Sequence, residues 1–313
     1  MKTNLSIGIP TYNQGQFLQE TIDSILSQTI LPDEIVISNN FSDDNTEEIL
    51  EQYEDNRLFK IIKPSKFIKM CSNWNFTAKN CNTDFFSLIS SDDVLESNFV
   101  ESFMSHRKPD CLFYRGNFNI INEHGKKLGK QSLRSVPYVQ SFPNNFLNQF
   151  HGPKGAFPSF IISKELYNQV GGYDEKFNFF ADWHLLLKIS DKTNFCHINK
   201  IISNYRVSYR EGLNYKRTIN GGLEDIIYTL DYISKKINDY NLKRFRFFYK
   251  ISVRIHMYQS MKLLNESDQS QKKMIQHFIK KMNVNIDKTE LVIFINKYIL
   301  RTFELILRFV KIN

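Results

Sequence analysis

Residues 85–95 read Phe-Phe-Ser-Leu-Ile-Ser-Ser-Asp-Asp-Val-Leu, and this stretch indicates the class of fold. The apolar run at its start predicts a buried strand, which is followed by two serines and then by Asp92 and Asp93. Adjacent carboxylates at a strand end can cap a following helix, as apolar residues at helical spacing from Leu95 onward suggest, or they can bind a divalent cation. The stretch alone leaves both alternatives open.

Strands and helices alternate upstream of this stretch. Apolar periodicity predicts the following elements: strands at 5–9, 34–38 and 58–62, and helices at 17–28, 49–53 and 73–80. Strands separated by helices of this length predict right-handed βαβ crossovers and a mostly parallel sheet. The fold class is therefore α/β.

Polar turns follow three of the predicted strands, at residues 11–13, 39–44 and 90–93. In parallel sheets, ligands bind beyond the carboxyl ends of the strands, which is where these turns lie. The missing GxGxxG and GxxxxGK(S/T) patterns argue against a dinucleotide-binding fold and against a P-loop enzyme. A nucleotide held by Asn and Thr side chains and by a metal-bridged diphosphate fits the residues that are present, because Mg²⁺ or Mn²⁺ needs only one or two carboxylates besides phosphate.

The pattern changes after residue 111. We predict a hairpin at 118–126, a polar segment with four prolines at 126–158, a strand at 159–162, a helix at 164–170 that stops at Gly171-Gly172, and one or two strands within 195–207. Asp182 opens a strongly apolar helix between these elements. Taken alone, Asp182 is also explained as a helix N-cap.

Composition limits the partners that the chain can have. Of the 313 residues, those after residue 240 include 15 Lys and Arg but only 5 Asp and Glu, which indicates an anionic partner or a solvated basic surface. No apolar run approaches the roughly 20 residues that span a bilayer, and no signal peptide is recognisable, so we expect a cytoplasmic protein. Four scattered cysteines without a CxxC pair argue against zinc and against a disulfide framework, and predict reduced thiols.

The region beyond residue 215 is predicted to be helical, with helices at 226–233, 245–264 and 291–312. One interpretation is a subdomain packed on the rest of the chain or on another subunit of a homo-oligomer. The other is a peripheral anchor at 290–313 on the inner face of the cell membrane, with Lys and Arg facing anionic lipids. Nucleic-acid binding is disfavoured, because no motif for it is present.

Several short motifs occur in one order along the chain. They are Ile9-Pro10-Thr11-Tyr12-Asn13, Ile35 to Asn40 with Ser42 and Asp44, Asn73-Trp74-Asn75, Ser91-Asp92-Asp93, Val170 to Glu175, Asp182-Trp183-His184-Leu185 and Tyr205-Arg206-Val207. With these motifs, residues 3–210 resemble the family 2 glycosyltransferases, which are inverting enzymes with the GT-A fold. The resemblance implies a Rossmann-like, mostly parallel mixed sheet in a catalytic domain at 1–214, with donor binding in 1–115 and the acceptor side in 116–214, and a helical region at 215–313.

The resemblance also implies roles for particular residues. Asp182 matches the family's usual general base, and Asp92 with Asp93 resembles the DxD-type motif that binds Mn²⁺ or Mg²⁺ and the donor diphosphate. Asn39 stands where the family usually has an aspartate that reads the base. The implied nucleotide-binding set is Pro10, Thr11, Tyr12, Asn13, Asn39, Asn73, Ser91 and Asp92. The implied acceptor-side set is Asp174, Trp183 and Arg206.

Four departures from the family pattern bear on the chemistry. Asn39 is an amide, which donates as well as accepts. Ser90 replaces the first acid of DxD, so Asp92 or Asp93 carries the metal with less help. Ala181 replaces the glutamate that usually precedes the base, and Ser208 stands near a position often held by a histidine.

The leading prediction is an inverting glycosyltransferase of bacterial surface polysaccharide synthesis. It moves a sugar from a nucleoside-diphosphate donor, with UDP favoured, to a glycan or lipid-linked glycan acceptor. One alternative is a catalytically impaired scaffold that binds sugar nucleotides, which Asn39, Ser90 and Ala181 suggest. Another is a sugar-phosphate nucleotidyltransferase, which would show a basic Gly-rich loop after the first strand, whereas residues 11–15 contain no Lys or Arg.

Overall fold

The structure is a computed structural model, and it describes residues 2–131, 138–207, 209–263, 269–284, 296–300, 302 and 303. The chain divides into two compact units. The first comprises Met1–Phe142, Gly155–Lys176 and Lys188–Tyr209, and the second comprises Pro143–Lys154, Phe177–Leu187 and Arg210–Asn313. The boundary between Tyr209 and Arg210 lies close to residue 214, where we expected the catalytic domain to end. That domain limit stays a prediction. The second unit also includes two short earlier segments of the chain.

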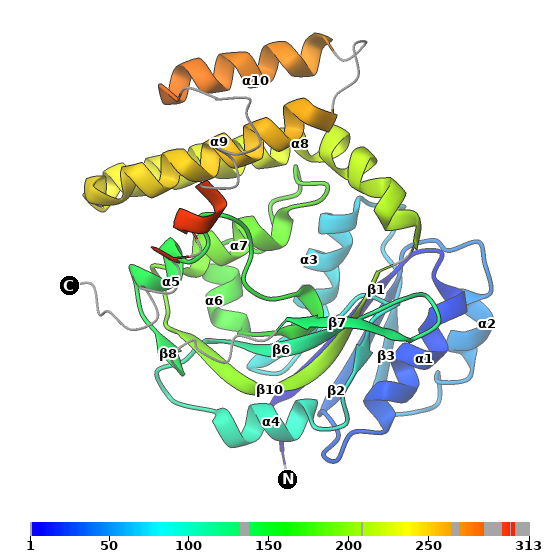
Figure 1. Ribbon diagram of the computed structural model, residues 1–313. Coiled ribbons are helices and arrows are strands. Elements are labelled where there is room, and N and C mark those ends of the chain that lie inside the picture. The colour runs from blue at the N-terminus through cyan, green and yellow to red at the C-terminus, as the bar shows by residue number, and fades with distance from the viewer. Residues whose placement is uncertain are drawn as a thin grey trace. The chain divides into compact units, whose positions relative to one another are not determined.

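The first unit is built on one sheet. Its strands are β1 (Leu5–Thr11), β2 (Glu34–Asn39), β3 (Phe59–Ile62), β4 (Phe85–Leu88), β5 (Val94–Leu95), β6 (Phe113–Ile121), β7 (Lys127–Gln131), β8 (Val139–Gln140), β9 (Phe160–Ser163) and β10 (Phe195–Arg206). Among the described residues the order is β3-β2-β1-β4-β9-β6-β10-β5, with β7 beside β6 and β8 beside β10 (Figure 1). Strands β1 to β4 are mutually parallel, and β9 runs antiparallel between β4 and β6. The predicted α/β fold with a mixed, mostly parallel central sheet is confirmed.

Helices cover both faces of this sheet. Those of the first unit are α1 (Gly15–Leu26), α2 (Thr46–Glu51), α3 (Met70–Asn80), α4 (Phe99–His106) and α6 (Lys164–Gln169), with a short 3₁₀ turn, η1 (Phe157–Ser159). The chain moves from β1 to β2 to β3 in one direction and then returns to β4, so right-handed crossovers place α3 on the face opposite to α1 and α2. Gly8 of β1 shows how closely α3 approaches, because a Cβ there would lie 2.9 Å from Cγ2 of Thr77.

The main core lies on the face covered by α1, α2 and α4. Alternate residues of β1 point into it, and successive apolar residues of α1 meet them at helical spacing. The residues that make this contact are Leu5, Ile7, Ile9, Leu18, Ile22 and Ile25, all of them fully buried. Because this packing holds α1 rigidly on the sheet, the carboxyl ends of β1 and β4 have a firm support.

The capping alternative for Asp92 and Asp93 is wrong. Helix α4 begins only at Phe99, with Asn98 in the N-cap position. Leu95 belongs instead to the short strand β5, which pairs antiparallel with β10. The helix start predicted from the spacing of the apolar residues is therefore wrong, because Leu95 pairs with β10 as part of a strand.

Two of the cysteines correct the expectation of reduced thiols. Cys111 and Cys196 are joined in a disulfide, with their Cα atoms 6.2 Å apart, whereas Cys71 and Cys81 are free and buried. The pairing arises because β6 and β10 run side by side and in parallel, with Cys196 opposite Tyr114. The two cysteines are 85 residues apart in the sequence, so no local sequence pattern predicts that they are neighbours.

The second unit is helical, as predicted. It contains α5 (Asn144–Leu147), the first part of α7 (Ala181–Ile189), α8 (Tyr209–Asp239) from Arg210 onward, the 3₁₀ turn η2 (Lys243–Phe245), α9 (Arg246–Leu263) and α10 (Gln269–Met282). Its core includes Leu230 of α8, whose carbonyl accepts a 2.9 Å hydrogen bond from the Tyr249 hydroxyl of α9.

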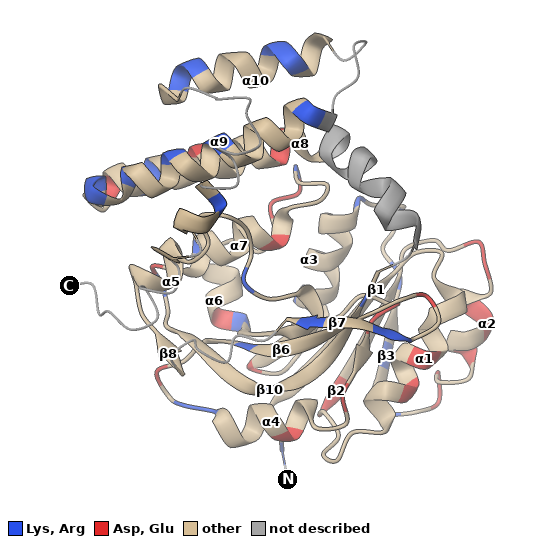
Figure 2. Cartoon of the chain, viewed as in Figure 1, with Lys and Arg blue, Asp and Glu red and all other residues tan. Residues whose placement is uncertain are grey.

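Basic residues recur on the helices of this unit. Lys280 and Lys281 lie in the last turn of α10, and Lys and Arg are prominent along α9 (Figure 2). Within the membrane contact expected at 290–313, the structure describes residues 296–300, 302 and 303, and the rest of that range lies outside the described residues. No helix among the residues that the structure describes is both long enough and apolar enough to cross a membrane.

Candidate functional site

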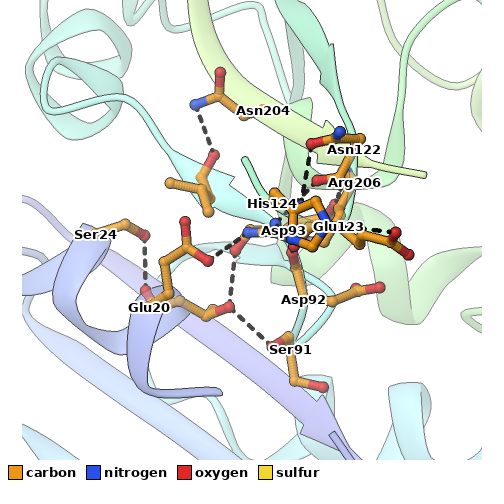
Figure 3. A network of polar contacts seen from close by, with 12 residues as sticks. Glu20, Ser24, Ser91, Asp92, Asp93, Asn122, Glu123, His124, Asn204 and Arg206 are labelled. Atoms are coloured by element: carbon orange, nitrogen blue, oxygen red, sulfur yellow. Dashed lines mark hydrogen bonds and ion pairs between the residues drawn. The ribbon is translucent and has the colours of Figure 1, made fainter. Parts of the chain in front are cut away.

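The turn between β4 and β5 separates the two aspartates that the sequence placed together. Asp93 is fully buried, and its Oδ1 accepts the backbone N–H of Arg206 at 2.9 Å. Asp92 is partly exposed, and the hydroxyl of Ser90 donates a hydrogen bond to its side chain. Asp92 thus has a carboxylate available at the carboxyl edge of the sheet, whereas Asp93 ties this turn to β10 (Figure 3).

Arg206 is the principal support of this turn. Its Nε donates to the carbonyl of Asp92 at 2.6 Å, and its Nη1 donates to the carbonyls of Asn122 and Glu123 at 3.1 and 3.0 Å. Its Nη2 forms a 2.5 Å ion pair with Glu20 of α1. Since the guanidinium is buried and these contacts engage Nε and both terminal nitrogens, Arg206 lies beneath the turn, and its predicted acceptor-side role stays a prediction.

Helix α1 holds the turn from the other side. The buried hydroxyl of Thr21 lies 2.9 Å from the carbonyl of Ser91 and 2.8 Å from that of Asp93. The backbone N–H of Leu95 donates to Oγ of Ser24 at 3.1 Å. The backbone around Asp92 is therefore fixed before any ligand binds, which is the preorganisation that a binding carboxylate needs.

Burial raises the pKa of both acids in the turn. For Asp92 the charge of Arg206 and the Ser90 hydrogen bond act in the opposite direction. For Asp93, burial is joined by the charge of Asp92, and the pKa lies well above the usual range. No group of three His, Cys, Asp or Glu side chains within the described part of the chain forms a complete metal site. One partly exposed carboxylate nevertheless fits Mn²⁺ or Mg²⁺ when substrate phosphates supply other ligands, so Asp92 suits the ion better than Asp93.

The turns after β1 and β2 are hydrogen-bonded to each other. Asn40 N–H donates to the carbonyl of Thr11 at 3.0 Å, and Asn13 N–H donates to Oγ of Ser42 at 3.0 Å. Asp43 N–H donates in return to Oδ1 of Asn13 at 2.9 Å. These bonds place the predicted Pro10–Asn13 segment beside the second polar turn, at the edge where β4 also ends.

The predicted asparagines of this edge are buried and engaged within the protein. Asn39 accepts the backbone N–H of Ser42 at 3.1 Å and donates from Nδ2 to the carboxylate of Glu47. Asn73 accepts the hydroxyl of Ser38 at 2.6 Å. An aspartate at position 39 would face the carboxylate of Glu47, which gives a physical reason for the amide at this position.

The Asn73-Trp74-Asn75 and Gly-Gly-Tyr motifs meet in the first unit. Oδ1 of Asn75 accepts the backbone N–H of Tyr173 at 2.9 Å, and its Nδ2 donates to the carbonyl of Tyr173 at 2.9 Å. Gly172 has φ +62°, and a Cβ there would lie 2.6 Å from Oδ1 of Asn75, so glycine is required. Asp174 follows this junction and forms a 3.0 Å ion pair with Lys176.

Asp182 belongs to the second unit and lies in the first turn of α7. Its Oδ1 accepts the backbone N–H of Trp183 at 2.7 Å, and burial raises its pKa to about 6. The side chain keeps partial exposure, and no Lys or Arg is paired with it among the residues that the structure describes. A carboxylate with this pKa is ionised at neutral pH and still basic enough to take a proton.

The neighbours of Asp182 are core residues. The Trp183 side chain is buried and donates from Nε1 to the carbonyl of Gln149 at 2.6 Å, which argues against direct contact with an acceptor. His184 is also buried and stacks on Phe177, with ring centroids 4.7 Å apart. Of these three residues, only Asp182 keeps partial exposure.

Asp225 of α8 was not identified from the sequence. Its Oδ2 accepts the backbone N–H groups of Asn178, Phe179 and Phe180, at 2.9, 2.8 and 3.2 Å. These three residues directly precede α7, so Asp225 positions the segment that carries Asp182. A single acid in an amphipathic helix gives no sequence signal of such a role.

Replacement of Asp225 by Ala should destabilise the protein by about 2–4 kcal/mol, because three partly buried hydrogen bonds from backbone N–H groups lose their common acceptor. Urea unfolding followed by circular dichroism measures this change. Glu224→Ala is the matched control, since Glu224 is exposed on the same helix. Equal unfolding midpoints for the two variants would show that Asp225 does not hold the segment.

Comparisons with a family model and with known proteins point to one family. The family model described as "Glycosyl transferase family 2" matches residues 6–171. The hyaluronan synthase of Pasteurella multocida is 29% identical over 219 residues, which cover 68% of this chain and 21% of that protein. This chain thus spans about a fifth of the length of that relative.

Solved structures share the fold. The S. aureus TarS fragment 1–349 has a TM-score of 0.57 at 17% identity, over 76% of this chain and 65% of that chain. The mannosyltransferase PcManGT from Pyrobaculum calidifontis, solved with GDP-Man and Mn²⁺, has a TM-score of 0.54 at 12% identity, over 74% and 64% of the respective chains. At these identities the likeness concerns the fold alone.

Proposed function

The chain belongs to glycosyl transferase family 2 and is a glycosyltransferase, and from this premise we propose that it transfers a sugar, with inversion, from a nucleoside-diphosphate donor to a glycan or lipid-linked glycan acceptor. The observation that carries this proposal is the partly exposed Asp92 carboxylate, held by Arg206 and α1 where a donor diphosphate would bind. Bacterial surface polysaccharide synthesis, with contact to the inner membrane surface, is the proposed context.

The donor side of the proposed reaction lies in the first unit. The segment Pro10–Asn13 and the turn at Ser91 would line the nucleoside, with Asn39 and Asn73 supporting them from below. Asp92 would hold Mn²⁺ or Mg²⁺, and the bound ion would offset the negative charge of the leaving diphosphate. A TarS structure contains UDP-GlcNAc, and the PcManGT structure contains GDP-Man and Mn²⁺, which supports a nucleotide-sugar donor and favours UDP no more than GDP.

The acceptor side of the reaction needs a base, and we assign this role to Asp182. The acceptor hydroxyl oxygen attacks the anomeric carbon, the bond from that carbon to the diphosphate oxygen breaks, and Asp182 takes the hydroxyl proton. The nucleoside diphosphate leaves with the bonding electron pair, so the sugar changes its anomeric configuration. Asp174 is the next candidate for contact with the acceptor. The Ser90 hydroxyl donates a hydrogen bond to Asp92, which favours the charged form of this carboxyl and so supports a working enzyme over the impaired scaffold.

The direct test is turnover with purified protein, Mn²⁺ and a panel of UDP- and GDP-sugars, measured as release of nucleoside diphosphate with and without glycan acceptors. We expect acceptor-stimulated release with one donor sugar. Binding of nucleotide sugars without turnover on any acceptor would favour the scaffold. Release of pyrophosphate from a nucleoside triphosphate and a sugar phosphate would identify a nucleotidyltransferase instead.

A further inference from the structure

A short turn joins α8 to α9 at one end of this helical pair, and hydrogen bonds fix its backbone. Asn241 has φ +53°, in the left-handed region that often ends a helix, and its N–H donates to the carbonyl of Asn238 at 3.1 Å. Leu242 N–H donates to the carbonyl of Ile237 at 2.8 Å, and both of these side chains are buried. The bonds form a Schellman motif at the end of α8, so the turn has a defined conformation.

Beyond this turn, buried and exposed residues alternate at helical spacing. Leu242, Phe245 and Tyr249 are buried within the second unit. Three cations and two large aromatic residues are exposed around them, with 42% of Tyr240 and 58% of Phe247 accessible to solvent. We call the exposed group the hairpin tip, which consists of Tyr240, Lys243, Arg244, Arg246 and Phe247. Figure 2 shows Lys and Arg at this end of α8 and α9.

The chain around the turn carries a strong positive charge. Residues 235–250 contain six Lys and Arg but only one acid, Asp239. Two of the six, Lys236 and Lys250, donate to backbone carbonyls within the second unit. Arg246 donates to the side-chain oxygen of an asparagine, which is a neutral partner and does not offset the charge of the guanidinium. The hairpin tip therefore suits an anionic partner.

The segment where membrane contact was expected, 290–313, uses its described apolar residues differently. Leu300 and Phe303 are buried, and the Phe303 ring stacks on Phe248 of α9 with the centroids 3.7 Å apart. Leu300 lies in one apolar cluster with Ile251 of α9. In the described part of this segment, these side chains are thus packed within the protein and are not available to lipid.

The chemistry of the hairpin tip fits the surface of a bilayer. Lys and Arg attract anionic headgroups, and aromatic rings beside them enter the boundary between headgroups and acyl chains. Phe247 has no polar atom in its side chain, so its exposure to water contributes nothing to folding. Proteins that stack nucleic-acid bases on aromatic rings use a positively charged groove that follows the strand, whereas the hairpin tip is the turned end of two helices.

We propose that the hairpin tip docks on a bilayer surface that contains anionic lipids, with its three cations at the headgroups and Phe247 inserted into the interface. The inference rests on the proposed function, because a lipid-linked acceptor lies at such a surface, and it assigns the membrane contact to residues outside 290–313. The defined conformation of the turn favours docking, since little conformational freedom is lost on binding.

Sedimentation of the full chain with vesicles tests this docking. The vesicles consist of phosphatidylcholine alone or of equal parts of phosphatidylcholine and phosphatidylglycerol. We expect binding to the anionic vesicles only, and weaker binding at high salt. Lys243→Ala/Arg246→Ala should bind these vesicles about 25-fold more weakly, at about fivefold for each cation. Lys273→Ala/Lys280→Ala is the matched control, because it removes two exposed cations from α10 of the same unit and should leave most of the affinity.

Insertion of the aromatic residue has its own readout. Phe247→Ala should weaken binding to the anionic vesicles about fivefold or more, because the buried apolar area is lost. In Phe247→Trp, the tryptophan emission should shift to shorter wavelength when anionic vesicles are added. The two tryptophans of the wild-type protein, Trp74 and Trp183, lie outside the hairpin tip and should not respond. Tyr298→Ala, which removes a ring that is 68% exposed within 290–313, should leave vesicle binding unchanged.

The outcomes separate this docking from the proposed function. Failure of the wild-type protein to bind anionic vesicles would overturn the docking, as would equal losses of binding in the two double variants. Binding of a single-stranded oligonucleotide that Lys243→Ala/Arg246→Ala weakens, without any vesicle binding, would assign the hairpin tip to nucleic acid. Release of nucleoside diphosphate with a soluble acceptor should be equal in the wild-type protein and that variant. Its absence in both would refute the proposed function, whereas sedimentation decides the docking independently.

Discussion

Asp182→Asn should lower turnover by about 100- to 10,000-fold, which is the usual contribution of a general base, while donor affinity stays near the wild-type value. The amide has nearly the shape of the carboxylate but cannot accept the acceptor proton. Steady-state release of nucleoside diphosphate measures turnover, and calorimetry with UDP and Mn²⁺ measures binding. Unchanged turnover would transfer the role to another acid, and Asp174→Asn is the variant to examine next.

The pH dependence gives a second readout of the same residue. The pKa of Asp182 is about 6, so the base is ionised above that pH and protonated below it. Turnover should therefore fall as the pH decreases through about 6. The free energy of unfolding should change in the opposite sense: burial favours the neutral carboxyl, so the stabilisation is greatest near pH 4 and is lost as the pH rises through about 6. Asp182→Asn should remove the fall in turnover and should reduce the pH dependence of unfolding, to which the raised pKa values of Asp92 and Asp93 also contribute.

Asp92→Ala should abolish the dependence of UDP affinity on Mn²⁺. The wild-type protein should bind UDP more tightly with Mn²⁺ than with EDTA, because the ion links the carboxylate to the diphosphate. In the variant, the two titrations should give the same affinity. This readout does not require turnover, so it remains informative if the acceptor is not found.

Two controls accompany Asp92→Ala. Asp55→Ala removes an exposed acid elsewhere in the first unit and should leave the metal dependence intact. Asp93→Asn keeps an acceptor for the N–H of Arg206 and should retain most of the metal dependence, because Asp93 is fully buried. If Asp93→Asn abolished the dependence and Asp92→Ala did not, the assignment of the two acids would be reversed.

The sequence predicted the sheet and its polar edge because apolar periodicity and turn residues are local signals. Strands β1 to β4, the hairpin of β6 and β7, and α6 lie close to the predicted ranges. The start of α4 was mispredicted because Leu95 lies in a strand and pairs with Ser203, which is distant in the sequence. The Cys111–Cys196 disulfide escaped prediction for the same reason, since only the register of β6 against β10 brings the two residues together.

The sequence predicted which residues belong to the candidate site, but it did not predict the separate role of each residue. Motif spacing singled out Asp92, Asp93 and Arg206 together. Only side-chain burial shows that Asp93 and Arg206 lie inside the protein, where they support the turn, and that Asp92 is the partly exposed acid. Asp225 gave no motif signal, because it acts through hydrogen bonds from backbone N–H groups, and these depend on tertiary structure.

The ion pair between Glu20 and Arg206 joins residues 186 positions apart in the chain. During synthesis, the turn at Asp92 can therefore reach its final shape only after β10 has left the ribosome and docked. Residues 6–171, the part that matches the family, would by themselves lack this last support. Completion of the proposed metal and donor site would thus be a late event in folding.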